Sequence, residues 1–104
     1  MTLIKFFKSR DTLTGFEIEG HTGAGVYGND IVCAAVSSAA LMTVNTITEI
    51  IGAKAQITQE DGFLSVKLSK QDAKNCRQVL KGLELHFIEL GRRYADNINV
   101  ITEV

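Results

Sequence analysis

Cysteine and histidine are scarce in this chain of 104 residues, with two of each, and proline and tryptophan are missing altogether. Cys33 and Cys76 are far apart in the sequence, so in a reducing compartment we expect two separate thiols rather than a disulfide. The two cysteines and two histidines show none of the spacings of a metal site, such as C-x-x-C. We therefore expect no bound metal, and no stretch of the chain resembles a linker or a low-complexity segment.

An excess of basic residues is also missing, because 11 lysines and arginines stand against 12 aspartates and glutamates. A net charge of −1, with both signs mixed along the chain, argues against direct binding of nucleic acid. Residues 31–51 come closest to a membrane span of roughly 18 apolar residues, but polar side chains interrupt them. The N-terminus lacks the basic, apolar and small regions of a signal peptide. We therefore expect a cytoplasmic protein without a membrane segment.

The length predicts one domain, residues 1–104, and the patterns of apolar and polar residues predict five strands and two helices. Their order is ββαββαβ, which predicts an α+β fold with a mainly antiparallel sheet packed with two helices. The second hairpin turns at Glu60-Asp61-Gly62, and a capping box at Ser69–Asp72 begins the second helix. The expected strands cover residues 2–8, 13–20, 53–59, 62–69 and 97–104, and the expected helices cover residues 31–51 and about 70–94.

The first helix carries an apolar stripe so wide that we expect the helix to be mostly buried. Asn29 or Asp30 would cap its start, and Gly52 would end it. In the second helix, apolar residues recur at spacings of three and four from Cys76 onward and predict a side that faces the core. Cys76 itself fits that core, whereas His86 fits the surface or the flank of the same helix.

The stretch from His21 to Cys33 concentrates the reactive side chains. His21 stands at the end of the second expected strand, a glycine-rich loop follows, and Cys33 lies in the first turn of the expected helix. Free N–H groups and the partial positive charge at a helix start favour the thiolate, the form of cysteine that attacks a carbonyl carbon. A histidine across a flexible loop can serve as general base and acid, and backbone amides can supply an oxyanion hole. The arrangement favours nucleophilic catalysis by a Cys–His pair.

Each of these residues also has a purely structural interpretation. Cys33 can be a small buried hydrophobe on an apolar helix, and His21 can bond to backbone at a strand end. Asp30 can orient His21 or simply cap the helix. Ser37, one helical turn after Cys33 on the same face, can hydrogen-bond in the site or to its own helix backbone. A non-enzymatic binding module with a merely packed Cys33 therefore stays open at this point.

The segment Gly23–Gly28 also matches G-x-G-x-x-G between a strand and a helix, which is the context of a dinucleotide-binding turn. The chain is short for such a unit, and the preceding hairpin implies antiparallel pairing. Nucleotide binding through this loop is a third possibility, on a motif that is weak by itself.

The sequence around these residues resembles the ribosomal-processing cysteine protease family, Prp. The likeness lies in Glu19-Gly20-His21, in Gly23 and Gly28, and in residues 30–37, Asp-Ile-Val-Cys-Ala-Ala-Val-Ser. The resemblance implies a cysteine endopeptidase that removes the N-terminal extension of a bacterial large-subunit ribosomal protein. Cys33 would then be the nucleophile and His21 the general base and acid. The resemblance also implies a small cytoplasmic homodimer that needs no cofactor.

The resemblance further implies that the loop from Thr22 to Asn29 orders over bound peptide. The residues that would contact the substrate there are Thr22, Gly23, Gly25, Tyr27 and Gly28. The family's substrates carry an aromatic pair before the cleavage point, which an apolar cleft beside Cys33, with Tyr27 as a wall, would accommodate. Ordering a loop so rich in glycine costs backbone entropy, which contacts with the substrate would have to offset.

Overall fold

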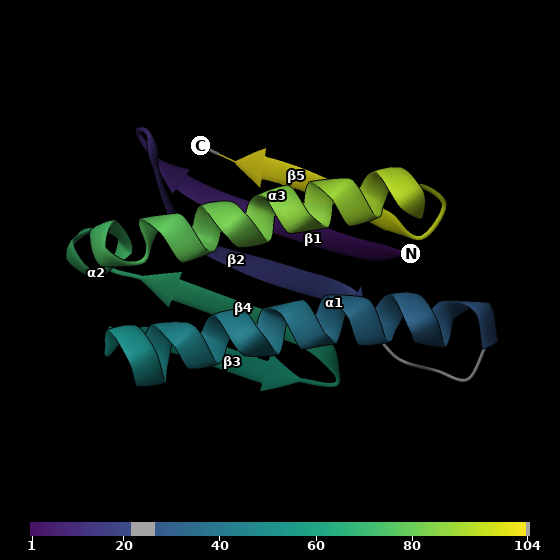
Figure 1. The fold of residues 1–104 in the computed structure, drawn as a ribbon, viewed down its shortest axis with the longest axis horizontal. Helices are drawn as coiled ribbons and strands as arrows, with labels where there is room; N and C mark the ends of the chain where they lie inside the picture. The colour runs from purple at the N-terminus through teal and green to yellow at the C-terminus, as the bar shows by residue number, and fades with distance from the viewer. Residues whose placement is uncertain (22–26, 104) are drawn as a thin grey trace.

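The structure, a computed structural model, describes residues 1–21 and 27–103, of which His21 and residues 27–30 are described by their backbone only. A five-stranded sheet is covered by helices on one face (Figure 1). The strands are β1 (Thr2–Ser9), β2 (Thr12–His21), β3 (Ala55–Glu60), β4 (Gly62–Leu68) and β5 (Ile98–Glu103). The helices are α1 (Tyr27–Asn45), the π-helical segment η1 (Thr46–Ile51), α2 (Lys70–Asn75) and α3 (Arg77–Arg93). This order confirms the expected α+β fold.

The sheet has the strand order β3-β4-β2-β1-β5, so β3 and β5 form its edges. Neighbouring strands run antiparallel except for β1 and β5, which are parallel. Both expected hairpins, β1–β2 and β3–β4, are present. Gly62 has a φ of 72°, as the expected Asp-Gly turn requires. Edge strand β3 is exposed along most of its length.

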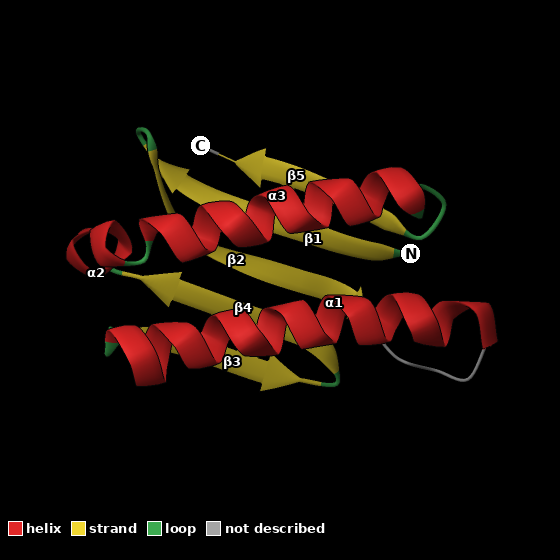
Figure 2. Cartoon of the chain, in the orientation of Figure 1, coloured by secondary structure: helices red, strands yellow, loops and turns green. Residues whose placement is uncertain are grey.

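The core fills the space between the sheet and helices α1 and α3, which lie side by side on the same face (Figure 2). Alternate residues of β1 and β2 point into this layer, and the rings of Phe6 and Phe16 are fully buried with centroids 5.9 Å apart. Phe87 of α3 packs over Phe6, with centroids 6.2 Å apart. Leu80 and Leu83 are buried on the same side of α3, which confirms its predicted core-facing side.

The first helix begins earlier than predicted. α1 starts at Tyr27, so Asn29 and Asp30 lie within its first turn instead of capping a helix that starts at residue 31. At the other end, η1 continues the helix to Ile51. Gly52 then ends it in the left-handed region at a φ of 76°, as expected.

The first helix is also less buried than predicted. Of the most apolar 18-residue stretch within Ile31–Ile51, only 28% is buried, and residues such as Val36 pack on the sheet. By length and composition alone, this segment is long and apolar enough to cross a membrane. Because polar residues interrupt it, the sequence analysis predicted no membrane segment. The opposite side of α1, continued by η1, carries exposed apolar residues, which we call the outer surface of α1: Ile31 and Met42 of α1 and Ile50 of η1.

The second helix is broken where one continuous helix was expected. α2 ends at Asn75 and α3 begins at Arg77, with Cys76 between them at a φ of −103° and a ψ of 6°. The predicted cap is present, because the backbone N–H of Asp72 donates a hydrogen bond to Ser69 Oγ at 3.2 Å. Cys76 is fully buried at the break, as predicted for a core residue.

Candidate active site

Cys33 lies on α1 with its side chain partly exposed and its thiol free. Because α1 begins at Tyr27, Cys33 is the seventh residue of the helix and lies in its second turn, not in the first turn as predicted. The electrostatic effect of a helix terminus falls off within the first turn. The helix start alone therefore cannot account for an activated thiol, and more of the argument rests on a neighbouring base.

His21 is the last residue of β2, and its backbone pairs with Gly62 at the start of β4. The pairing register shifts between Glu19 and His21, so the strand bulges at Gly20. Gly20 has a φ of 80°, and a Cβ atom there would lie 2.6 Å from the carbonyl oxygen of Met1. Only glycine fits this position without strain, and bulges of this kind change the direction of the following residue. The side chain of His21 lies outside the described atoms.

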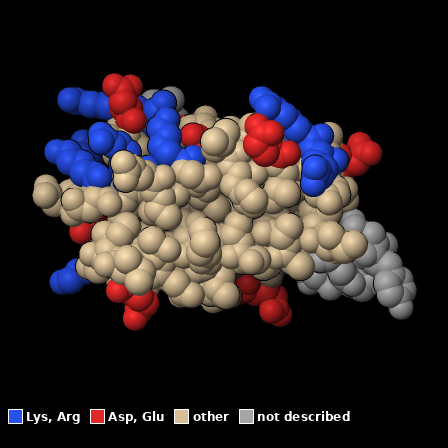
Figure 3. Space-filling view, in the orientation of Figure 1, with Lys and Arg blue, Asp and Glu red and all other residues tan. Residues whose placement is uncertain are grey.

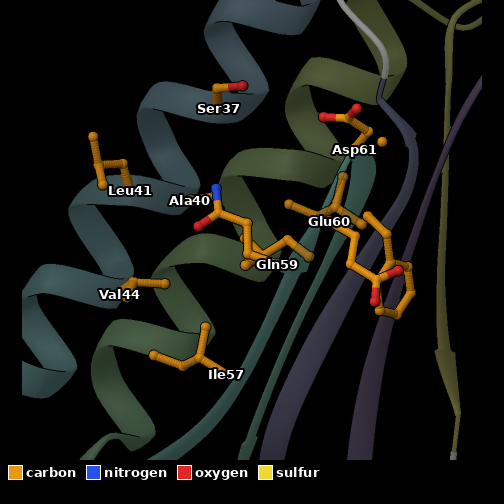
Figure 4. Close-up of a pocket in the computed structure, with 12 residues that line it drawn as sticks. Ser37, Ala40, Leu41, Val44, Ile57, Gln59, Glu60 and Asp61 are labelled. Atoms are coloured by element: carbon orange, nitrogen blue, oxygen red, sulfur yellow. The ribbon is translucent and has the colours of Figure 1, made fainter.

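A cleft of about 390 Å³ lies between α1 and the β3–β4 hairpin (Figure 4). Ser37 and Asp61 lie at one end of it, and Val44 and Ile57 lie at the other. The cleft therefore runs along the helix, with a polar end and an apolar end. The residues labelled along its two walls are Ser37, Ala40, Leu41 and Val44 from α1 and Ile57, Gln59, Glu60 and Asp61 from the hairpin.

The two predicted catalytic residues belong to different elements, and a neighbour of each lines the cleft. Cys33 precedes Ser37 by one helical turn, so both lie on the same side of α1. His21 ends β2, and its backbone partner Gly62 lines the cleft directly after Asp61. Neither residue 21 nor residue 33 itself lines the cleft, but each has a neighbour that does, Gly62 across the sheet from residue 21 and Ser37 one helical turn from residue 33.

The other predicted site residues fall into three groups. Thr22, Gly23 and Gly25 lie outside the described residues, as does the expected ordering of their loop over substrate. Tyr27, Gly28 and Asp30 belong to the first turn of α1, so the loop that we expected to reach Asn29 gives way to helix at residue 27. Ser37 is exposed on α1 and lines the cleft.

The hairpin residues of the cleft and the bulge at Gly20 were missed by the sequence analysis. A glycine directly before a histidine at a strand end is a signal for a bulge, which the sequence analysis did not use. Ile57, Gln59 and Asp61 gave no such signal, because only the folded chain places them opposite residues 37–44.

The second cysteine is unsuited to nucleophilic catalysis. Burial, and to a lesser degree the nearby Asp72 carboxylate, raise the pKa of the Cys76 thiol above its ordinary value of 9.0. The thiolate is therefore scarce at neutral pH, and no substrate can reach a fully buried sulfur. His86, on the exposed side of α3, is far along the chain from the cleft and does not line it.

Two other kinds of site find little support in the geometry. Among residues 1–21 and 27–103, no three His, Cys, Asp or Glu side chains gather as a possible metal site. β2 runs antiparallel to both of its neighbours, whereas the strand before a dinucleotide-binding turn belongs to a parallel sheet.

Comparison with known proteins yields a family that matches almost the whole chain. The family model described as cysteine protease Prp matches residues 1–99. The chain is 24% identical over 98 residues to the ribosomal processing cysteine protease Prp of Bacillus subtilis (strain 168), covering 88% of each protein. It is 26% identical over 90 residues to the protein of the same name from Staphylococcus aureus (strain Mu50), covering 85% of each.

Solved structures share the fold over nearly their full length. The ribosomal processing protease Prp from S. aureus in complex with a substrate peptide superposes with a TM-score of 0.89 at 21% identity, covering 99% of this chain and 100% of that one. The SMU.848 protein from Streptococcus mutans also superposes with a TM-score of 0.89, at 22% identity and with 99% of each chain covered. At these identities the superpositions establish the fold.

Proposed function

Because the chain belongs to the cysteine protease Prp family, we propose that it removes the N-terminal extension of a protein of the bacterial large ribosomal subunit. Two relatives from different bacteria bear the name ribosomal processing cysteine protease, which supports a substrate of this class. The cleft that begins at Ser37, one helical turn from Cys33, supports cleavage of an extended peptide, because it is open and partly apolar. We place the reaction in the cytoplasm, where ribosomal proteins are made.

The proposed mechanism uses Cys33 and His21 as a dyad. His21 takes the proton from the Cys33 thiol, and the sulfur attacks the carbonyl carbon of the scissile peptide bond. A C–S bond forms, the C–N bond breaks, and the imidazolium returns its proton to the departing amine. Water, deprotonated by the same imidazole, then hydrolyses the thioester and releases the enzyme. The observation that supports this assignment is that Ser37, one helical turn from Cys33, and Gly62, the backbone partner of His21, line the same cleft.

The test compares single substitutions on a peptide that carries the extension and its cleavage point. We expect Cys33→Ala and His21→Ala each to lower kcat/KM by at least about a hundredfold, since each removes a group that takes part in bond making or proton transfer. His86→Ala is the matched control, because it removes the other histidine from an exposed position on α3. Circular dichroism of each variant verifies the fold. Wild-type cleavage rates in either dyad variant would remove that residue from the mechanism.

We also propose that the protein is a homodimer that buries the outer surface of α1. Met42 and Ile50 are 64% and 80% exposed, and an apolar surface of this kind on a folded chain marks an interaction site. Lys and Arg side chains gather above α3, whereas the surface along α1 is largely free of charge (Figure 3). A surface without charges can pair with its own copy without repulsion or desolvation of ions.

The dimer is tested by introducing a charge on either helix. Met42→Glu places a carboxylate in the outer surface of α1, and we expect it to shift the sedimentation coefficient from dimer to monomer across a dilution series. Leu85→Glu on α3 is the matched control, because Leu85 is 61% exposed and lies outside that surface. A Met42→Glu protein that sediments as the wild type, or a monomeric wild type, would contradict the proposal.

A further inference from the structure

We propose that the cleft between α1 and the β3–β4 hairpin selects substrates by two side chains remote from the scissile bond, a cationic one at its polar end and an apolar one at its apolar end. The inference rests on the proposed peptidase function and adds to it a substrate class: peptides with a basic residue near the cut and a large aliphatic or aromatic residue farther from it. Every residue that carries the argument belongs to the described part of the chain.

The apolar end is built as a docking surface. Val44 from α1 and Ile57 from β3 form its walls (Figure 4), and Leu64 and Ile18 line the cleft level with Gln59. Ile57 stands on edge strand β3 and is 42% exposed, although an isoleucine gains free energy by leaving water. An apolar side chain of a bound peptide would cover Ile57 against Val44, whereas the cleft without a ligand leaves both partly in solvent.

Among the described side chains, the polar end carries the negative charge of Asp61 without a lysine or arginine beside it. Asp61 projects from the β3–β4 turn toward the Ser37 end of the cleft (Figure 4). Glu60 also lines the cleft, and the described lining residues include no lysine or arginine. Among the described residues, the Asp61 carboxylate takes part in neither of the two ion pairs, Lys5–Glu103 and Arg92–Glu89. A peptide cation at this end would supply the positive charge that the described lining residues lack beside the Asp61 carboxylate.

The helix provides the spacing between these contacts and the scissile bond. Ser37 follows Cys33 by four residues, about 6 Å along α1, and Val44 follows Ser37 by seven residues, about 10 Å. An extended peptide advances about 3.3 Å per residue. The cationic side chain should therefore lie about two residues from the scissile bond, and the apolar side chain about three residues beyond it. Both lie on the same side of the cut.

The first experiment measures kcat/KM for peptides with Lys, Gln or Glu at each of the first four positions on either side of the cut. At one of these positions we expect wild type to prefer Lys over Glu by about fivefold, because reversing one charge next to a surface carboxylate is worth about 1 kcal/mol. Asp61→Asn should shrink this ratio, and Asp61→Lys should invert it. Asp11→Lys is the matched control, because it makes the same change in the other hairpin turn, outside the cleft.

The pattern across peptides separates selectivity from an indirect effect on His21. A carboxylate that merely positions the imidazole would, when replaced, slow every peptide by the same factor and leave the Lys-to-Glu ratio unchanged. That result, or an equal rate for Lys and Glu peptides in wild type at all eight positions, would overturn the cationic contact. For the apolar contact, Ile57→Thr should reduce the preference for Leu over Ser at the distal position. Ile101→Thr, on the opposite edge strand, should not.

Peptide binding to the Cys33→Ala variant tests the cleft independently of cleavage. Fluorescence anisotropy should give a lower Kd for the Lys peptide than for the Glu peptide, by the same ratio as in the kinetics. If wild type cleaves none of the peptides but this ratio persists, the peptidase proposal fails and the cleft proposal stands. If cleavage is efficient but neither rate nor Kd distinguishes the peptides, the cleft proposal fails and the peptidase proposal stands.

Discussion

Helices α1 and α3 lie against the same face of the same sheet, yet they differ on the sides that face away from it. Both bury an apolar side, through residues such as Val36 on α1 and Phe87 on α3. The outer side of α3 is charged and includes an ion pair of 2.8 Å between Arg92 and Glu89. The outer surface of α1 is apolar, with Ile31 of α1 and Ile50 of η1 exposed by 68% and 80%. The charged outer side of α3 is suited to solvent, whereas the apolar outer side of α1 is the surface that the proposed dimer would bury.

The two thiols should show the largest difference between the regions. Cys76, at the junction of α2 and α3, is fully buried, while Cys33 on α1 is partly exposed. Alkylation of Cys76 needs an opening that costs about 5 kcal/mol or more, so its labelling by iodoacetamide should be at least about a thousandfold slower than that of Cys33. Mass spectrometry should find only Cys33 labelled in the native protein and both Cys33 and Cys76 labelled in the denatured protein. Equal labelling rates in the native protein would contradict the division between the helices.

The core of α3 should be more sensitive to truncation than its surface. Phe87→Ala removes a fully buried ring that packs on Phe6, and we expect it to lower the free energy of unfolding by about 3–5 kcal/mol. Val36→Ala on α1 loses less buried surface and should cost about 2 kcal/mol. Leu85→Ala, an exposed position two residues from Phe87, should stay within about 0.5 kcal/mol of wild type. Urea denaturation measures all three.

Alkaline pH should weaken the α2–α3 junction through Cys76. Since burial raises the pKa of this thiol, the unfolded chain releases the proton before the folded chain does. The contribution of the Cys76 thiol to the free energy of unfolding is therefore undiminished below the ordinary pKa of 9.0. It declines as the pH rises above that value, by at most about 1.4 kcal/mol per pH unit. Denaturation of wild type and Cys76→Ala at pH 8 and pH 10 should show the difference in stability between them narrowing at the higher pH. A constant difference would show that the thiol does not titrate differently on unfolding.

The smallest changes in stability should come from replacing glycine by alanine in the two helical regions, and these two changes should have opposite signs. Gly82→Ala lies within α3 with open space around the added methyl group, and it should stabilise the protein by about 0.5–1 kcal/mol. Gly52→Ala also meets no neighbour within 4 Å, but its φ of 76° strains any L-residue. It should destabilise the protein by about 1 kcal/mol. Thermal denaturation should move Tm in opposite directions.

Sequence reasoning succeeded where local pattern and fold agree. The hairpin at Gly62, the cap at Ser69, the stop at Gly52 and the buried side of α3 all follow from neighbouring residues, and the structure confirms them. Family membership was likewise foreseen from the segment between Glu19 and Ser37.

Sequence reasoning failed where contacts between residues far apart in the sequence determine the structure. Gly28 and Asn29 form helices poorly, yet α1 includes them. The width of the apolar stripe on α1 indicated burial, but a stripe cannot tell a core-facing side from one that awaits a partner. The break at Cys76 interrupts a pattern that continues through it at spacings of three and four. The cleft joins residues near 40 to residues near 60, which no local pattern connects.

Edge strand β3 has a practical consequence for handling the protein. Residues 55–60, Ala-Gln-Ile-Thr-Gln-Glu, favour strand structure and include no proline or lysine, the residues that commonly guard such an edge. In concentrated stocks, two molecules can join their sheets here and begin an ordered aggregate. A lysine in place of Thr58, whose neighbours already face solvent, would keep the stock clear at the concentrations that crystallisation or NMR demands.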